Sequence, residues 1–420
     1  MLGAGRRRYP ELLLEGHART GMFDPFEHVG GKVSRPQDLD LTLTALLVSK
    51  STNIGFEPVI KPGEKALTRS RLTAADWGYW NLPGMSAASG LLVGRQGDID
   101  LASDWGGAHV ASADGMRFTV PLKSIHTRPN RKYISTGRGA TWLNVVSDRV
   151  MGLGGIVMPG TLRDSLGILD AMFNLDGPVR PEIVITDTGS YLDLVFGLFA
   201  ICGYQFSPRI ADISDARLWR LDMSKDYGPL QPVSRQRVQV ERTWQNWEDM
   251  LRVAGSLTTG KVRAYDLLRM MTSGDRMTGL GDAFAHHGRI FKTLHIILQF
   301  IDSEAYRRMI GVQLNIGEGR HALARNIFFG RLGELRHAYR EGMDQLGALG
   351  MALNAVVWTT LYMDAAVKEL EAGGLTISPE IRSRLSPLVH EHIVHGRYPI
   401  VRSHGDGSLR PLSYPAASEE

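Results

Sequence analysis

The segment from Pro181 to Pro208, PEIVITDTGSYLDLVFGLFAICGYQFSP, predicts a buried strand followed by a helix and a second strand. Its first six residues begin with proline and are rich in β-branched side chains, which is typical of a buried strand. Asp187 follows directly, and an apolar helix is expected from near Leu192 until Gly203 stops it. Open α/β sheets place ligands at the carboxyl ends of such strands. Asp187 is therefore a candidate site residue, with a simple helix-capping role as the alternative.

Strand and helix patterns alternate around this segment. Residues 106–125, GGAHVASADGMRFTVPLKSI, predict two strands joined by a tight turn at Asp114 and Gly115, because Asp-Gly tolerates the positive φ of a hairpin. Residues 141–147, TWLNVVS, predict a further strand. The resulting order is strand, strand, strand, helix, strand, helix, strand, which predicts an α/β fold with a mixed sheet. Asp114 is a second acid beside a strand, and a role as turn former is the alternative.

Basic residues, aromatic residues and glycines are interleaved in residues 128–142, RPNRKYISTGRGATW. Such a loop can follow a phosphate backbone while aromatic rings stack on unpaired bases. The candidate DNA contacts are Arg128, Arg131, Lys132 and Arg138, with Tyr133 and Trp142 as stacking rings. Ordinary solvated charge is the alternative. The net charge of +4 is compatible with a polyanion partner and does not require one.

A third acid lies in residues 313–329, QLNIGEGRHALARNIFF. Glu318 follows Gly317 and is expected in the first turn of a helix, where a carboxylate often serves only helix electrostatics. Glu318, His321 and Arg325 fall at i, i+3 and i+7 and therefore share one helix face. Two cationic side chains on this face indicate a site that also holds an anion, so Arg320, His321 and Arg325 are further candidate DNA contacts.

Mainly helical patterns fill the rest of the chain. The stretch from Gln345 to Met363 contains no charged residue. Glycines and polar residues interrupt it, so we expect a buried core helix and not a membrane span. The expected divisions are a helical region at 1–103, the first part of the α/β core at 104–213, a helical insertion at 214–305, the third-acid helix with C-terminal helices at 306–400, and a tail at 401–420.

Two other patterns do not predict sites. Residues 255–262, GSLTTGKV, are one residue short of a phosphate-binding loop, and Val262 stands where a magnesium-binding hydroxyl is needed, so we expect no nucleotide cofactor. Residues 390–395, HEHIVH, lack the spacing of a zinc protease, and the chain has a single cysteine. We interpret these histidines as structural.

Three acids thus stand at corners of the predicted core: Asp114, Asp187 and Glu318. Two-metal phosphoryl transfer needs such a set, because anionic oxygens must hold two divalent cations close together and leave room for the scissile phosphate. An all-carboxylate set favours Mg²⁺ or Mn²⁺ over Zn²⁺. A hydrolase acting on sugars would need two acids and no metal, so metal dependence separates the two classes.

At these residues the sequence resembles the DDE transposases of the Tn3 family, the enzymes of replicative transposons. ASADGMRFTVP resembles the first-acid motif of that family, TDTGSYLDLVFGLFAICGYQFSPRIAD the second, and LNIGEGRHALARNIFFGRLGELRHAYREG the third. The resemblance covers nearly the whole chain. It implies an RNase H-like fold with a helical insertion before Glu318, and it implies that Asp114, Asp187 and Glu318 are the catalytic metal-binding triad.

The same resemblance implies a function. The expected activity is DNA cleavage at transposon ends and strand transfer into target DNA, with two Mg²⁺ ions that Mn²⁺ can replace. The expected partners are DNA and a second copy of the chain, in a homodimer or larger assembly, and the expected location is the cytoplasm near the nucleoid. Family members are longer and carry upstream DNA-binding domains, so we expect this chain to lack them and to bind transposon ends weakly. The alternative is a truncated remnant that acts only as a DNA-binding or interaction module.

Overall fold

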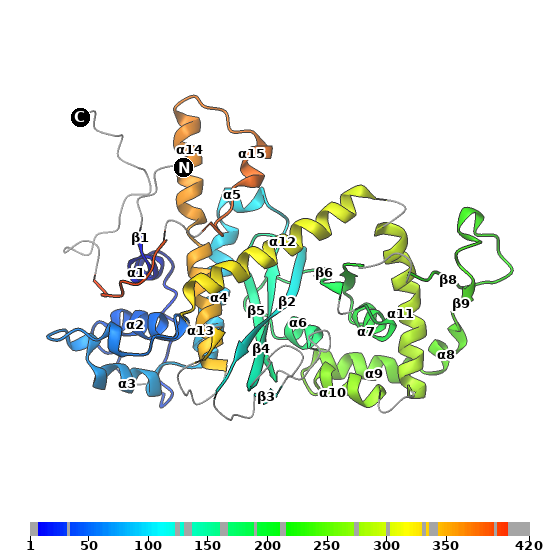
Figure 1. The fold of residues 1–420 in the computed structure, drawn as a ribbon, viewed down its shortest axis with the longest axis horizontal. Coiled ribbons are helices and arrows are strands. Elements are labelled where there is room, and N and C mark those ends of the chain that lie inside the picture. Colours follow the sequence, from blue (N-terminus) through cyan, green and yellow to red (C-terminus); the bar gives the residue numbers. More distant parts are fainter. Residues whose placement is uncertain are drawn as a thin grey trace.

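A mixed six-stranded sheet lies at the centre of the molecule, between the N-terminal helices and a group of later helices (Figure 1). The computed structural model describes residues 7–31, 34–121, 127–129, 137–159, 167–188, 191–210, 216–272, 277–299, 303–329, 333–335, 343–389 and 393–401. The strands of the sheet are β2 (Val110–Thr119), β3 (Arg128–Pro129), β4 (Arg138–Ser147), β5 (Gly152–Pro159), β6 (Ile183–Thr186) and β7 (Gln205–Pro208). β5, β4 and β2 are antiparallel, and β2, β6 and β7 are parallel. The predicted α/β class with a mixed sheet is confirmed.

The predicted hairpin at Asp114 is wrong, because β2 runs straight through it. Nine consecutive residues of β2, from Ala111 to Thr119, pair with β4. Gly115 is therefore extended and has no positive φ. Long-range pairing with β4 overrides the local turn preference of Asp-Gly, since β-structure depends on cross-strand partners more than on intrinsic propensity.

The strand-helix-strand unit predicted around Asp187 is confirmed. β6 ends at Thr186, α7 (Asp193–Ile201) follows, and β7 lies beside β6 in parallel register. The parallel crossover from β5 to β6 contains α6 (Ile168–Phe173). This topology places Asp187 at the carboxyl end of a buried parallel strand, as the sequence predicts.

The long helix α12 (Glu304–Ile327) crosses the sheet and contacts β2, β4 and β6 (Figure 1, yellow). Glu318 lies deep inside α12 and not in a first turn, so that part of the prediction is wrong. Gly317 does not break the helix. It marks a close approach instead, since a Cβ at this position would lie 3.2 Å from the Ser112 hydroxyl of β2. The glycine thus lets α12 sit close to the strand that carries Asp114.

N-terminal and C-terminal helices pack together beside the sheet. The former are α1 (Tyr9–Thr20), α2 (Leu39–Ser51), α3 (Arg69–Gly78), α4 (Leu82–Gly97) and α5 (Asp100–Ser103), with 3-10 turns η1 (Glu57–Val59) and η2 (Lys65–Leu67). The latter are α13 (Met343–Val357), α14 (Thr360–Ala372) and α15 (Pro379–Arg384). α13 packs against α2 and α4. β1 (Arg7–Arg8) pairs with β10 (Ile393–Val394), so segments near both ends of the chain meet.

One helical stretch among the described residues, Leu346–Ala372, has the length and apolar composition of a membrane span, and 67% of its most apolar window is buried. It turns between Val357 and Thr360, where α13 ends and α14 begins. The buried side chains of α13 agree with the prediction of a core helix.

The segment between β7 and α12 is mainly helical, as the sequence predicts. It contains β8 (Trp219–Arg220), η6 (Gly228–Leu230), β9 (Gln236–Arg237), α8 (Val240–Gln245), α9 (Trp247–Thr258), α10 (Ala264–Met271) and α11 (Gly279–Ile297). α11 packs tightly along α7, and two glycines make this possible. A Cβ at Gly288 would overlap the main-chain oxygen of Asp193, and one at Gly197 would overlap that of Phe284. The proposed domain boundaries stay predictions.

Replacing Gly288 with alanine is expected to lower the free energy of unfolding by about 1–3 kcal/mol, because the new methyl group meets main-chain atoms that cannot rotate away. Gly255→Ala is the matched control, since no atom lies within 4 Å of a Cβ there. That control is expected to raise stability by about 0.5–1 kcal/mol through helix propensity. Urea unfolding measures both variants. Equal unfolding midpoints for Gly288→Ala and the unsubstituted chain would contradict the close packing of α7 and α11.

Candidate active site

Two of the three predicted acids are carried by adjacent strands, since Asp114 lies in β2 and Asp187 directly follows β6. β2 and β6 pair in parallel so that Ser112 is opposite Ile185. The pairing ends at these two residues. Asp114 lies two residues beyond Ser112 and Asp187 two residues beyond Ile185, and the charge of Asp187 acts on Asp114. Asp187 is exposed, and Asp114 is half-buried. The strand register therefore explains why two acids separated by a long stretch of sequence meet at one sheet edge.

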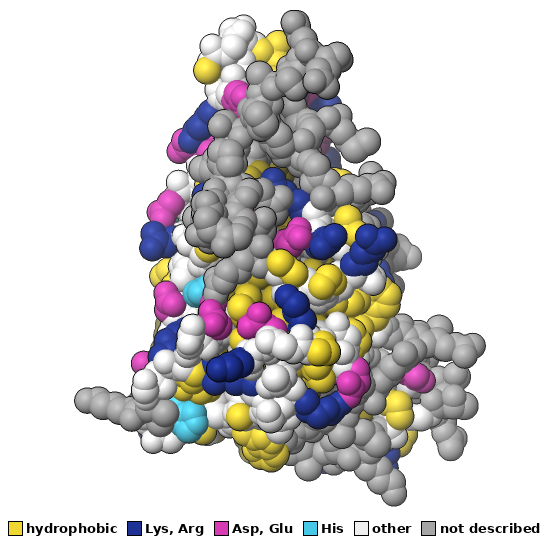
Figure 2. Space-filling view, turned by 90° about the vertical axis from the view of Figure 1, so that its left-hand side faces the viewer, with side chains coloured by type: hydrophobic (Ala, Val, Ile, Leu, Met, Phe, Trp, Pro, Cys, Tyr) yellow, Lys and Arg dark blue, Asp and Glu magenta, His cyan; other side chains and the backbone are white. Residues whose placement is uncertain are grey.

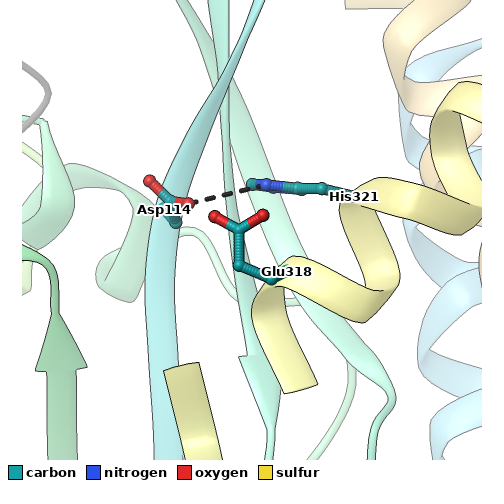
Figure 3. A group of neighbouring side chains, drawn as sticks. All are labelled: Asp114, Glu318 and His321. Carbon is teal, nitrogen blue, oxygen red and sulfur yellow. Dashed lines mark ion pairs between the residues drawn. The ribbon is translucent and has the colours of Figure 1, made fainter. Parts of the chain in front are cut away.

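The third acid comes from α12, which carries Glu318 and His321 toward Asp114 (Figure 3). One carboxylate oxygen each from Asp114 and Glu318 and one ring nitrogen of His321 lie within 4.8 Å of one another. Gln313 anchors this helix, because its Nε2 donates to the Ser112 hydroxyl at 3.1 Å and to the Val146 carbonyl at 2.9 Å. The helix is thus bound to both β2 and β4 one and a half turns before Glu318.

Negative charge accumulates at Asp114. Burial raises the pKa of its carboxyl, and the nearby carboxylates of Asp187 and Glu318 raise it further. The main-chain N–H of Gly115 donates to its Oδ1 at 2.7 Å and acts in the opposite direction, as does the positive charge of Arg117. The shift shows that the charges of Asp187 and Glu318 both act on Asp114. A divalent cation would relieve this repulsion, and carboxylate oxygens are its preferred ligands.

His321 is buried beside this cluster, with 3% of its surface exposed. Burial lowers the pKa of its imidazole to about 4, against the raising effect of Glu318, so the ring is neutral at pH 7. Its Nδ1 lies 3.5 Å from Oδ2 of Asp114, and its Nε2 lies 2.8 Å from Nδ2 of Asn144. The contact with Asp114 is therefore not a salt bridge at neutral pH.

The structure thus brings Asp114 and Glu318 together and places Asp187 beside them. Within the described part of the chain, the tight group contains His321 and not Asp187. The two carboxylates provide the hard oxygen ligands that Mg²⁺ and Mn²⁺ prefer, and Asp187 is positioned to add a third. The residues present therefore fit a divalent metal site.

The predicted DNA contacts lie in different environments. Arg325 is exposed on α12, and Arg138 is half-buried at the start of β4. Arg128 begins β3, while Arg131, Lys132 and the predicted stacking residue Tyr133 lie outside the described residues. On the face shown in Figure 2, described Lys and Arg side chains are interspersed with Asp and Glu, so that face is not a basic surface.

Three predictions of this group need correction. Arg320 has 1% of its surface exposed, and its Nη2 donates to Oδ1 of Asn354 at 2.8 Å, so its guanidinium does not face DNA at the molecular surface. His321 is buried in the acid cluster. Trp142 is 5% exposed within β4 and cannot stack on a base. A one-dimensional pattern of basic and aromatic residues does not show which of them the sheet and α13 will cover.

Asn144 is a site residue that sequence reasoning did not find. It lies directly opposite Asp114 in the antiparallel register of β2 and β4 and has 2% of its surface exposed. Its Nδ2 contacts both the Asp114 carbonyl and His321. The signal was present, since a polar residue interrupts the apolar strand TWLNVVS, but it becomes informative only once the strand register is known.

Comparisons with known proteins show which proteins this chain is similar to. A family model described as the Tn3 transposase DDE domain matches residues 11–398. The transposase for transposon Tn4556 of Streptomyces fradiae is 48% identical over 414 residues, which are 98% of this chain and 46% of that protein. The transposase for transposon gamma-delta of Escherichia coli (strain K12) is 47% identical, covering 91% of this chain and 38% of that protein. The transposase for transposon Tn1546 of Enterococcus faecium is 30% identical. The chain therefore spans less than half the length of the first two of these relatives.

Proposed function

The chain belongs to the Tn3 transposase DDE domain family, and from this premise we propose that it catalyses metal-dependent cleavage of DNA at transposon ends and strand transfer into target DNA. The observation that carries the proposal is the meeting of Asp114 and Glu318 from β2 and α12, with Asp187 beside them at the end of β6. A remnant freed from catalytic constraint would have no reason to keep them.

We extend the proposal to the fold. The order β5-β4-β2-β6-β7, with an antiparallel unit followed by two parallel crossovers, supports an RNase H-like core. The placement of α8–α11 between β7 and α12 supports an insertion before the third acid. In this reading the sheet carries the first two acids, and the helix that follows the insertion delivers the third.

Asp114, Asp187 and Glu318 would hold the divalent cations, with Mg²⁺ as the proposed ion and Mn²⁺ as its substitute. When bound, such ions activate an attacking oxygen and stabilise the leaving oxygen of a phosphodiester. The chain's own contribution is to fix the carboxylates: Gly115 orients Asp114, and Gln313 anchors the helix that carries Glu318. Glu318 and Asp187 are both exposed, so a DNA strand can reach this edge of the cluster.

A nicking assay tests the function. Supercoiled plasmid carrying a transposon end is incubated with the full chain, with the upstream end-binding domains of a relative supplied in trans, in Mg²⁺, Mn²⁺, Ca²⁺ or EDTA. We expect nicks that require Mg²⁺ or Mn²⁺. If the chain binds metal and DNA but never nicks, the interaction-module alternative is favoured, and nicking that persists in EDTA would overturn metal dependence.

Arg325→Ala is expected to weaken binding to DNA of any sequence and to reduce the slope of log affinity against log salt by about 0.9, the effect of one lost phosphate contact. The physical reason is its exposed position on α12, two turns after Glu318. Arg252→Ala on α9 is the control, since that arginine pairs with Asp249 at 2.6 Å. Fluorescence anisotropy over a salt series measures both slopes, and an unchanged slope for Arg325→Ala would return that residue to ordinary surface charge.

We also propose that the chain assembles as a homodimer or larger complex on DNA and acts in the cytoplasm near the nucleoid. Strand transfer joins two transposon ends to one target, so two active sites must be held together. Light scattering of the chain with and without end DNA tests the assembly. A single copy of the chain on each DNA molecule would contradict it.

A further inference from the structure

The inference concerns the role of His321 in the candidate metal site, and it rests on the proposed function. His321 lies close enough to Asp114 and Glu318 to act as a third metal ligand. A neutral imidazole can bind a metal only through a nitrogen that carries no proton. The question is therefore which ring nitrogen of His321 carries the proton, and the contacts around Asn144 answer it.

The amide of Asn144 has only one consistent orientation. Its terminal atom assigned as Nδ2 lies 3.2 Å from the main-chain oxygen of Asp114 and 2.8 Å from Nε2 of His321. A main-chain oxygen only accepts hydrogen bonds, so the atom that faces it must be the NH₂ group. The reversed amide would place two oxygens against each other. The Asp114 carbonyl thus fixes which terminal atom of Asn144 is the nitrogen.

This orientation fixes the state of His321. The NH₂ group of Asn144 only donates, so Nε2 of His321 must accept and carries no proton. The ring is neutral, and its single proton sits on Nδ1. That nitrogen is 3.5 Å from Oδ2 of Asp114, which is longer than a formed hydrogen bond but directs the N–H toward the carboxylate. Both oxygens of Asp114 then face a donor, Oδ1 from Gly115 and Oδ2 from His321.

We propose that His321 is a positioning residue that directs an Nδ1–H donor at Asp114, that Asn144 holds it in this tautomer, and that His321 is not a metal ligand. The ligands are then carboxylates only. Oxygen-only sites select Mg²⁺ and Mn²⁺, while a histidine ligand would shift preference toward Zn²⁺. The Asn144–His321–Asp114 chain thereby helps to specify which class of metal the site takes.

The first test reads the tautomer directly in the full chain without metal. A long-range proton–nitrogen correlation spectrum distinguishes Nδ1–H from Nε2–H in each histidine, and the His321 signals are assigned by their loss in His321→Asn. If that variant fails to fold, the signals that move in Asn144→Leu give the assignment. We expect Nδ1–H in the unsubstituted chain. An Nε2–H tautomer would overturn the proposal.

The second test measures Mn²⁺ and Zn²⁺ binding by calorimetry. Asparagine at position 321 places an amide donor near the former Nδ1, so His321→Asn is expected to keep Mn²⁺ affinity within about threefold. His321→Leu and Asn144→Leu are expected to lower it about tenfold, as loss of an outer-shell partner does. If His321 were a ligand, His321→Asn and His321→Leu would weaken Mn²⁺ equally and weaken Zn²⁺ more, which would overturn the proposal.

The two tests separate this inference from the proposed function. If the unsubstituted chain binds no divalent metal, the proposed function fails, while the spectrum of the same metal-free protein still decides the tautomer. If metal binds and the proton is found on Nε2, only the role of His321 fails.

Discussion

Asp114→Asn and Glu318→Gln are each expected to lower the rate of metal-dependent DNA cleavage by on the order of 10²- to 10³-fold or more. Each change replaces an anionic ligand by a neutral amide of nearly the same shape. Asparagine at position 114 can still accept the Gly115 N–H, so the strand geometry is expected to survive. The same substitutions should remove Mg²⁺ binding, measured as loss of the rise in melting temperature that Mg²⁺ gives the unsubstituted chain.

The raised pKa of Asp114 also predicts the direction in which Asp114→Asn changes the stability of the fold. The pKa of the Asp114 carboxyl is raised in the folded state, so folding opposes its ionisation. Its contribution to the free energy of unfolding therefore falls as the pH rises above the pKa of this carboxyl in the unfolded chain. At pH 7, without metal, Asp114→Asn is therefore expected to leave stability unchanged or to increase it. Loss of activity together with loss of stability would indicate a folding defect and contradict the assignment.

Asp187→Asn tests the residue that the tight group leaves out. If Asp187 belongs to the same metal site, Asp187→Asn should lower the rate of DNA cleavage as much as Asp114→Asn does. Asp98→Asn is the control, since Asp98 is exposed at the end of α4. Near-normal cleavage by Asp187→Asn in Mg²⁺ would remove Asp187 from the triad and leave Asp114 and Glu318 as a pair.

Local patterns predicted the parts of the site that local interactions determine. The strand, the acid and the helix around Asp187 follow each other along one short segment, and each has a sequence signature that the structure confirms. The helices between β7 and α12 were predictable for the same reason. The resemblance to the family predicted that the three acids form one triad. The spacing between them in the sequence could not predict this.

Long-range pairing determined the parts that local patterns missed. The local sequence of Asp114 and Gly115 predicts a turn, but nine residues of β2 pair with β4 through this position. The local sequence of Gly317 predicts a helix start, but this glycine lies inside α12, where it allows close approach to Ser112. Asn144 acquires a role only when the register places it opposite Asp114. Burial of Arg320 likewise depends on α13, which lies later in the chain than any motif that includes Arg320.

Asn354→Leu is expected to lower the free energy of unfolding by about 3–5 kcal/mol, because Asn354 joins three elements inside the core. Its Oδ1 accepts the Gly152 N–H of β5 at 2.9 Å and Nη2 of Arg320 at 2.8 Å, and its Nδ2 donates to the Gly152 carbonyl at 2.8 Å. Leucine fills a similar volume but removes the Asn354 partner of all three buried groups, and each group left unpaired costs about 1–3 kcal/mol. Nη2 of Arg320 keeps only a long contact of 3.4 Å with the Gly350 carbonyl. Urea unfolding at pH 7 measures the change, with exposed Asn315→Ala on α12 as the control.

Arg320→Met should behave differently from Asn354→Leu, although the two side chains are partners. Burial lowers the pKa of the Arg320 guanidinium to about 9, and within the described part of the chain its Nε and Nη1 have no hydrogen-bond partner. Replacing a poorly compensated buried charge with an apolar side chain of similar length is often neutral or stabilising. We therefore expect Arg320→Met to stay within about 1 kcal/mol of the unsubstituted chain or to exceed it.

The double variant decides between the two accounts of Arg320. In Arg320→Met/Asn354→Leu no guanidinium remains to be left unpaired, so its loss of stability should be smaller than the sum of the two single losses, with a coupling free energy of about 0.5–3 kcal/mol. The salt dependence of DNA binding should be unchanged in Arg320→Met, because the side chain is buried. Additive losses together with a reduced salt slope would show instead that Arg320 leaves the core to contact a phosphate, and would restore the sequence-based prediction for this residue.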